Sequence, residues 1–415
     1  MALLAAASLL ISAAIAWRGV GGTPPSTLGA FFDGHLYIDI ARSFPLPYAP
    51  EGRDYLGHAP LYPALLALAR ALTLHALDWG ALAVVASWVA SAACVPAFHA
   101  LAREVDVPAT PATAVFAFAN PAWLLLSAAP HAEPVAMLAA LLCLRACARG
   151  ASLASGGWLA LAFLARYPAI LLGAALAFDA LVVRRRRDAR TLAGLALPLA
   201  AFAAYHFYLA WRVPGFRGLW DAHQVQWDAK LTLPFAEMAA YWSYGNRASI
   251  QFPIIYASAA FYALATLVGL RPGEWRRAFL AVASGVVAGF HVSLSGEPGV
   301  DSFTRLAILA WPPSLLVAFR AARAAGAPAW PSLSRGSRAA LAVGLAGVCA
   351  WGAWVASRQI RVAIWMQGQR DWMRPKLESL DADAPQWTDF AEIHRRAGGG
   401  APAPARRGAE RPALD

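Results

Sequence analysis

The chain has 415 residues, of which 59% are hydrophobic and only 14% are charged, and its mean hydropathy is +0.48. This composition excludes a soluble globular domain of this size. The formal net charge of +11 would indicate a nucleic-acid partner in a soluble protein. Here we expect no nucleic-acid site, because the arginines gather in alternate loops between apolar segments, as the positive-inside rule predicts for cytoplasmic loops: 184–187 and 190; 271, 276 and 277; 320, 323, 335 and 338.

Apolar runs of about 20 residues, the length that crosses a bilayer, recur along most of the chain. The first, 2–17, lacks the basic residues that begin a secretory signal, so we expect an uncleaved helix. A polar first loop, 18–59, follows it. Together the runs predict an all-α polytopic membrane protein with about eleven transmembrane helices and short interfacial helices in its extracytoplasmic loops. The further predicted spans are 79–101, 108–129, 132–148, 153–167, 168–183, 191–210, 252–270, 277–294, 304–320 and 339–357.

Segment 60–77 is apolar but carries Arg70 and His75, so we interpret it as an interfacial helix. If it crossed the membrane, every later loop would change sides and the arginine clusters would face outward, against the positive-inside rule. With the N-terminus inside, the extracytoplasmic side holds loop 18–59, the turn "SAAPHAEPVA", a second large loop at 211–251 and "SGEPGVDSFTR".

These elements divide the chain into three parts. A transmembrane domain covers 1–357, and 358–396 form an extracytoplasmic C-terminal segment. Residues 397–415, "AGGGAPAPARRGAERPALD", are of low complexity, which predicts a disordered tail.

The stretch "FFDGHLYIDIAR" places charged residues beside the first apolar run. A carboxylate at the membrane boundary is costly to desolvate, so Asp33 is a functional candidate. The pattern predicts a short helix after Gly34, and Asp33 could alternatively serve as its N-cap. We interpret Asp39 and Arg42, three residues apart on that helix, as a surface pair.

Four segments in order resemble a known family. "FDGHLYIDIARSFP" followed by "HAPLYPALLALA" resembles the first-loop signature of GT-C integral membrane glycosyltransferases, most closely the GPI second-mannosyltransferase branch and its bacterial relatives. Asp33, Tyr37 and the "PLYP" element at 60–63 carry this match. The later segments are similar in type and order: "NPAWLLLSAAPHAEPVAMLAALL" with His131 and Glu133, "LAFLARYPAILLG" with Arg166, and "DSFTRLAILAWPPSLL" with Arg305. The resemblance covers roughly residues 1–320.

The resemblance implies an enzyme that moves a hexose, mannose in the branch named, from a polyprenyl-phosphate donor to a hydroxyl of a lipid, glycan or protein acceptor. Transfer would occur with inversion on the extracytoplasmic face, with Asp33 as general base. Arg305 and then Arg166 are the candidates that bind the donor phosphate. The residues expected to position substrate are Tyr37, His58, Tyr62, His131 and Glu133.

We expect no metal cofactor, although Glu51 and Asp54 could supply carboxylate ligands if the first loop held them in place. His58 and His131 could be purely structural, and Arg166 and Arg305 could extend to lipid headgroups. The rival classes are a transporter or lipid flippase and a non-catalytic subunit of the same fold. A composition rich in Ala, Arg and Pro indicates a high-GC bacterium, and hence its inner membrane.

Overall fold

A computed structural model describes ten stretches of the chain: 1–21, 24–30, 33–44, 57–213, 216–227, 229–244, 251–271, 277–295, 303–328 and 332–368. These stretches are almost entirely helical, which confirms the predicted fold class. The exception is an antiparallel pair of two-residue strands, β1 (Lys230–Leu231) and β2 (Leu294–Ser295), with Lys230 opposite Ser295. The two strands join segments more than 60 residues apart.

Within these stretches, six helical segments are long and apolar enough to cross a membrane, and a bent pair makes up to seven, so the chain is an integral membrane protein. The six are α1 (Ala2–Gly19), α4 (Trp79–Glu104), α10 (Ala189–Arg212), α13 (Gln251–Gly269), the run of α15 (Phe303–Leu306), η7 (Ala307–Ala310) and α16 (Trp311–Ala324), and α17 (Arg335–Gly368).

The remaining predicted spans coincide with shorter or broken helices. The bent pair is α5 (Ala109–Phe118) with α6 (Pro121–Ala128). Single helices α7 (Glu133–Ala148), α8 (Ser152–Ala165) and α14 (Ala278–His291) follow the predicted boundaries closely, and segment 168–183 contains η3 (Tyr167–Leu171), α9 (Leu172–Ala177) and η4 (Phe178–Val183). The number of segments that cross the bilayer stays a prediction.

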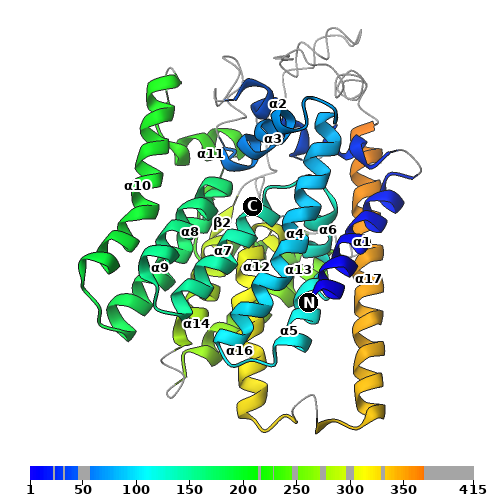
Figure 1. The fold of residues 1–415 in the computed structure, drawn as a ribbon, viewed down its shortest axis with the longest axis vertical. Coiled ribbons are helices and arrows are strands. Elements are labelled where there is room, and N and C mark those ends of the chain that lie inside the picture. Colours follow the sequence, from blue (N-terminus) through cyan, green and yellow to red (C-terminus); the bar gives the residue numbers. More distant parts are fainter. Residues whose placement is uncertain are drawn as a thin grey trace, which may run out of the picture.

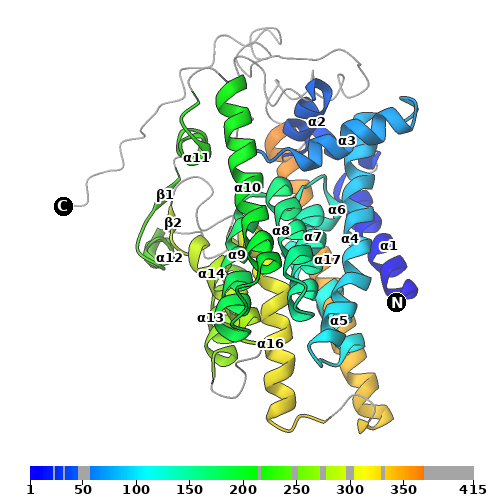
Figure 2. The same cartoon turned by 60° about the vertical axis from the view of Figure 1, so that its left-hand side comes forward.

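The long helices lie side by side in one bundle (Figures 1 and 2). α8 packs between α7 and α10, and α7 in turn packs on α4. α13 packs against α14 and α16, while α17 covers α1 and α6. The largest cluster of buried apolar side chains draws on both of the first two groups, so they form one continuous core.

The bend of 68° between α5 and α6 has a local cause. Pro121 has no backbone N–H and therefore begins a new helix rather than continuing α5. Asn120 caps this new helix, because its side-chain oxygen accepts hydrogen bonds from the backbone N–H groups of Ala122 and Trp123 at 2.9 and 3.2 Å. The short α6 then delivers the chain to the turn at 129–132.

Short helices gather at one end of the bundle, where α2 (Gly34–Ser43) and α3 (Leu61–Leu72) lie across the end of α4 (Figure 1). η1 (Pro25–Ala30) and α11 (Leu219–Trp227) lie at the same end, and α12 (Ala236–Tyr244) follows β1. The 12 residues of α3 span about 18 Å, too short for a bilayer core of about 30 Å. α3 therefore has the dimensions of the interfacial helix that its sequence predicts.

The last helix is longer than the predicted span 339–357, because α17 continues to Gly368 through residues assigned above to the C-terminal segment. Ile360 is fully buried and belongs, with Ile15, to an apolar cluster that joins α17 to α1. Ile364, one turn later, packs against the same cluster. These buried side chains explain why the helix continues past the polar residues around Arg358, where the predicted span ends. Residues 369–415, like Glu51 and Asp54, lie outside the described residues.

Close contact between α8 and α10 depends on two glycines. A β-carbon at Gly156 would collide with the backbone of Gly194, and one at Gly194 would collide with the backbone of Ser152. Small residues of this kind allow helix backbones to approach closely in membrane proteins. Gly157, the next residue, faces open space.

We expect Gly156→Ala to lower the free energy of unfolding by about 1–3 kcal/mol, because the added methyl group forces the two backbones apart. Gly157→Ala is the matched control and should leave stability unchanged or raise it by up to about 1 kcal/mol, since alanine is the better helix former. Unfolding of both variants in detergent, followed by circular dichroism, measures the difference. Equal effects at the two positions would contradict the packing described.

Candidate active site

Arg305 joins two carboxylates at the end of the bundle below α2. Its Nε donates a hydrogen bond to Oε1 of Glu133 at 2.6 Å, and its Nη2 donates to Oδ2 of Asp33. Arg166 Nη1 lies 3.3 Å from the same Glu133 Oε1. Two arginines and two carboxylates thus form one continuous chain of charge-assisted contacts: Asp33, Arg305, Glu133 and Arg166.

Glu133 is the first residue of α7 and its side chain is completely buried. Pro130 and Pro134 flank the turn that leads into this helix, so the chain cannot continue α6 and instead presents Glu133 at a helix start. The helix N-terminus favours a negative charge there. A buried carboxylate also needs cationic partners, and the two arginines supply them.

Arg166 owes its position to a break in the helix. α8 ends at Ala165 and η3 begins at Tyr167, while Arg166 itself has extended backbone angles, φ −157° and ψ 117°. Pro168 lacks the N–H that a continuing helix would require. α8 and α9 therefore form a hairpin, and the turn carries Arg166 to the buried carboxylate of Glu133.

Asp33 occupies the N-cap position of α2, yet its side chain makes no capping hydrogen bond. Its carboxylate pairs with Arg305 instead, so the capping alternative does not describe this structure. Burial alone would raise the pKa of Asp33, but the nearby positive charge of Arg305, above all, holds it well below its usual range. Asp33 is therefore a carboxylate at neutral pH.

Gly34 explains why a glycine follows Asp33. A β-carbon at this position would lie 2.7 Å from Cγ of Pro130 and 3.0 Å from the carbonyl oxygen of Gly29. The start of α2 can therefore rest directly on the turn before Glu133. This close approach places the two carboxylates within reach of one guanidinium group.

A cavity of about 730 Å³ opens beside these charges. Asp33, Arg166 and Arg305 lie on its wall together with four histidines, His58, His206, His223 and His291. Most of the remaining lining is apolar or aromatic and comes from five elements: Phe163 and Ala165 of α8, Ile170 and Leu171 of η3, Phe202 of α10, Leu219 and Trp220 of α11, and Phe290 of α14. The cavity thus combines a charged wall with an extensive apolar surface.

Of the residues expected to position substrate, Tyr37 and His58 line this cavity. The ring of Tyr37 makes edge contacts with His58 and Tyr62, with ring centroids 5.1 and 5.0 Å apart. Burial, first, and the charge of Glu133 raise the pKa of Tyr37, so its hydroxyl remains protonated and can only donate or accept hydrogen bonds.

Tyr62, His131 and Glu133 are buried behind the lining instead. The Tyr62 hydroxyl donates to the carbonyl oxygen of Ala83 at 2.7 Å and lies 3.1 Å from Ser87 Oγ. The same Ser87 hydroxyl donates to the carbonyl oxygen of His131 and accepts from its N–H. These contacts attach α3 and the turn at 129–132 to α4. Tyr62 and His131 could therefore affect substrate only through the residues they hold in place.

The ring of His131 is neutral at neutral pH, because burial, first, and the charge of Arg305 lower its pKa to about 4. Its Nδ1 lies 3.9 Å from Oε2 of Glu133. This pair therefore carries no salt bridge at neutral pH, and the arginines remain the cations that compensate Glu133.

The cavity also contains polar residues that sequence analysis did not identify. The Tyr167 hydroxyl donates to the carbonyl oxygen of His58 at 2.8 Å, and its ring makes an edge contact with His223. His291 Nε2 is buried without a hydrogen-bond partner among the described residues. Tyr167 directly follows Arg166 in "ARYP", which was a usable signal. His291, a single histidine ending an apolar helix, had none.

Among the described residues, no group of three or more histidine, cysteine, aspartate or glutamate side chains has the arrangement of a metal site. Asp39 and Arg42 lie 3.8 Å apart on one face of α2, but their side chains are only 17% and 4% exposed, so they form a largely buried pair and the predicted surface pair is wrong.

Comparisons with known proteins find similarity to solved structures but no match by sequence. No protein-family model matches the chain, and no curated protein matches its sequence. One solved structure that is similar is the crystal structure of ArnT from Cupriavidus metallidurans bound to undecaprenyl phosphate, which is 14% identical in sequence. The match covers 96% of this chain and 77% of that chain with a TM-score of 0.49.

We expect Asp33→Asn to destabilise the protein at neutral pH by about 1–3 kcal/mol, because Arg305 loses one of its charged partners. Since the pKa of Asp33 is lowered in the folded state, its contribution is complete above the unfolded-state pKa and is lost as the pH falls through the folded value. The stability difference should thus be constant down to about pH 5 and shrink below it. Thermal unfolding of both proteins across this range measures it, and a difference that grows on acidification would contradict the ion pair.

Gly34→Ala should separate Asp33 from Arg305, because the added methyl group would push the start of α2 away from Pro130. In this background Asp33→Asn should cost less stability than it does in the parent protein. A double-mutant cycle of unfolding free energies measures this coupling. Additive effects of the two changes would show that α2 does not depend on Gly34 to place the carboxylate.

Proposed function

We propose that the protein is a GT-C type membrane glycosyltransferase that moves a hexose, with mannose as the first candidate, from a polyprenyl-phosphate donor to a hydroxyl group of a lipid, glycan or protein. The reaction would take place on the extracytoplasmic face of a bacterial inner membrane. The observation that carries the proposal is the joint position of Asp33, Arg305 and Arg166 on the wall of one large cavity.

The reaction needs a base on one face of the anomeric carbon and a cation beside the phosphate on the opposite face. The acceptor oxygen forms a bond to the anomeric carbon from one face, and the bond between that carbon and the phosphate oxygen breaks on the other. The acceptor proton passes to the Asp33 carboxylate, and the departing electron pair stays on the lipid phosphate. Arg305 and Arg166 present planar guanidinium groups that can each donate two directed hydrogen bonds to this phosphate.

The ion pair between Asp33 and Arg305 would make the base strength of Asp33 depend on whether the donor is bound. A donor phosphate would compete with Asp33 for the Arg305 guanidinium, while Glu133 continues to hold Arg305 through Nε. Loss of the Arg305 contact removes the main interaction that lowers the pKa of Asp33. Asp33 would then be a stronger base when donor is present.

The rest of the cavity suits a ligand with two unlike parts. The apolar wall from α8, η3 and α10 offers contact for an isoprenoid chain. His223, His291 and Trp220 lie on the same lining and supply a ring face and imidazole nitrogens for sugar hydroxyls. His291 Nε2, which has no hydrogen-bond partner among the described residues, is the first candidate for such a hydrogen bond.

The structure offers less support for a transporter. Transporters place their polar residues near the bilayer midplane on broken helices within repeated halves. Here Asp33 stands at the start of α2 and pairs with Arg305. α2 itself lies with α3 at one end of the bundle (Figure 1). A non-catalytic subunit would keep the same contacts but would not require Asp33 for any reaction.

The test is transfer of labelled hexose from polyprenyl-phosphate hexoses in membranes that contain the intact protein or Asp33→Asn. We expect Asp33→Asn to reduce the transfer rate by about 100-fold or more at equal protein abundance, because it removes the general base while preserving shape. Asp39→Asn is the matched control, since Asp39 lies one turn and a half further along α2 and faces Arg42.

The three possible results separate the proposals. Loss of transfer in Asp33→Asn with normal transfer in Asp39→Asn supports a glycosyltransferase with Asp33 as base. Equal transfer by all three proteins assigns Asp33 a structural role. Absence of transfer by the intact protein from every polyprenyl-phosphate hexose would favour the transporter or the subunit.

A further inference from the structure

The segment that follows α11 exposes a group of large apolar side chains. Four of them are between 47% and 79% exposed: Leu231 of β1, Leu233 and Phe235 in the turn that follows, and Trp242 of α12. The stretch "LTLPFA", 231–236, contains no charged residue. These four side chains form an apolar patch, for which contact with water is unfavourable.

The backbone of this segment is fixed to the rest of the protein. The N–H of Thr232 donates to the carbonyl oxygen of Ser293 at 2.7 Å, and the N–H of Phe235 donates to that of Val292 at 2.9 Å. Met238 of α12 belongs to the largest apolar core cluster. With one side of the segment held against the bundle in this way, the apolar patch faces outward.

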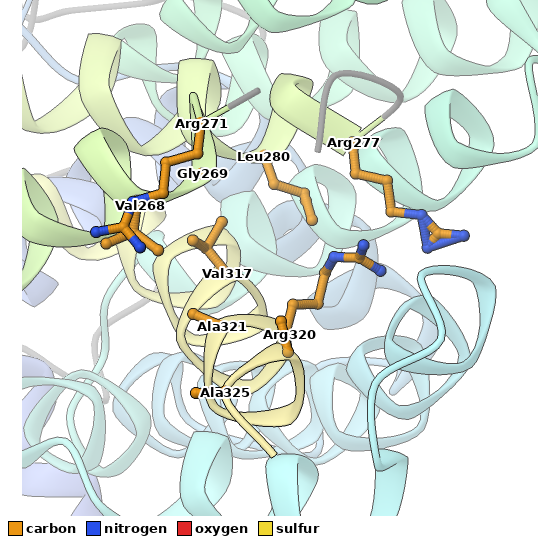
Figure 3. A pocket seen from close by; sticks show the side chains of 10 residues that line it. Val268, Gly269, Arg271, Arg277, Leu280, Val317, Arg320, Ala321 and Ala325 are labelled. Carbon is orange, nitrogen blue, oxygen red and sulfur yellow. The ribbon is translucent and has the colours of Figure 1, made fainter. Parts of the chain in front are cut away.

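The depth of Val292 follows from the packing of α13 on α14. Figure 3 shows the end where these two helices are joined, with Gly269 of α13 and Leu280 of α14 on the wall of one pocket. A β-carbon at Gly269 would lie 2.7 Å from that of Ala281, and Thr266 Oγ1 donates to Ser284 Oγ at 3.4 Å. The helices are therefore antiparallel, and each step back along α13 matches an equal step forward along α14.

This pairing sets the level of the exposed turn. Extended to the end of α14, it places Val292 level with about residue 258 of α13. The apolar span of α13 begins at Phe252. At 1.5 Å per residue, residue 258 lies about 9 Å inside that span. Phe235, which is bonded to Val292, is therefore inside the apolar thickness and not at its edge.

The contacts of α12 give the same direction independently. The ring of Tyr241 stacks on Phe252 with centroids 5.6 Å apart, while the Tyr256 hydroxyl donates to the carbonyl oxygen of Met238 at 2.6 Å. Going back along α12 from Tyr241 to Met238 thus leads from the start of α13 towards its middle. Phe235 lies still further back. Figure 2 shows β1 and α12 beside the bundle, with α11 nearer the end where α2 lies.

A turn inside hydrocarbon needs backbone groups that are bonded within the protein. The N–H groups of Thr232 and Phe235 are bonded to the residues that follow α14. The N–H of Ala236 donates to the carbonyl oxygen of Leu233 at 3.0 Å, and Pro234 has no N–H. The backbone of the turn thus meets this requirement while its side chains stay exposed.

The neighbouring surface of α13 indicates what covers the patch. Exposed side chains recur every three or four residues along one face of this apolar span: Pro253, Ala257, Ala260, Leu264 and Leu267. Such a face of a spanning helix meets lipid acyl chains. Trp242 packs on Phe252, with ring centroids 5.2 Å apart, beside the beginning of this face. The patch therefore continues a lipid-facing surface.

We propose that the apolar patch lies in the membrane, in contact with lipid acyl chains. Residues 229–244 are then a re-entrant segment inside the predicted loop 211–251, and not part of a water-exposed loop. Leu294, the strand partner of Leu231, lies on the wall of the larger cavity, so that cavity borders on the embedded segment.

The test is spin-label accessibility in phosphatidylcholine–phosphatidylglycerol vesicles that contain the full-length protein. All variants carry Cys349→Ser, because Cys349 is the least buried of the four cysteines. A nitroxide is attached to Leu233→Cys and compared with two matched controls. Leu264→Cys reports the lipid face of α13, and Gln224→Cys replaces an exposed residue of α11.

We expect dissolved oxygen, which concentrates in hydrocarbon, to relax the label at 233 at least about threefold more strongly than a water-soluble nickel chelate does. The label at 264 should behave in the same way, and the label at 224 should show the reverse order. Leu231→Cys is a second position in the patch, and the same result is expected there as at 233.

Two results would overturn the proposal. Relaxation by the nickel chelate as strong at 233 as at 224 would show that the turn lies in water. Protection of 233 from both reagents would show that protein covers the patch, either a partner or a second copy of this chain. The replaced side chains at 231 and 233 are exposed, so the fold should tolerate both changes. Sugar transfer enters none of these measurements, so their outcome is independent of the proposed function.

Discussion

The candidate active site depends on one constraint, the burial of the Glu133 carboxylate. A carboxylate removed from water is stable only with cations and hydrogen bonds around it, and Arg305 and Arg166 meet this need. Because Arg305 also pairs with Asp33, the constraint extends across 272 residues of sequence. It connects the starts of α2, α7 and α15 with the break after α8, and so determines where these segments lie relative to one another.

Around Asp33 the charges of the two signs are balanced, because two carboxylates and two arginines form one continuous chain of contacts. α14 also reaches this region, since His291 at its end lies on the wall of the larger cavity.

Much of the fold was predictable because the membrane imposes a local rule on the chain. The predicted spans match observed helices, and breaks at Pro121 and Pro168 have causes visible in the sequence. The end of α17 was harder to predict, since the buried contact of Ile360 with α1 extends the helix beyond its hydropathy signal. Asp33, Glu133, Arg166 and Arg305 were identified from motifs, and their catalytic roles stay predictions.

The sequence by itself determined that the chain crosses a membrane, which segments are helical, and which loops concentrate arginine, because hydropathy and charge are properties of single segments. Only the tertiary structure decided that Arg305 reaches both carboxylates, that Tyr62 and His131 lie behind the cavity wall, and that His291 lies on it. These facts depend on how separate helices pack, and a contact between residues 33 and 305 leaves no periodic pattern in either segment.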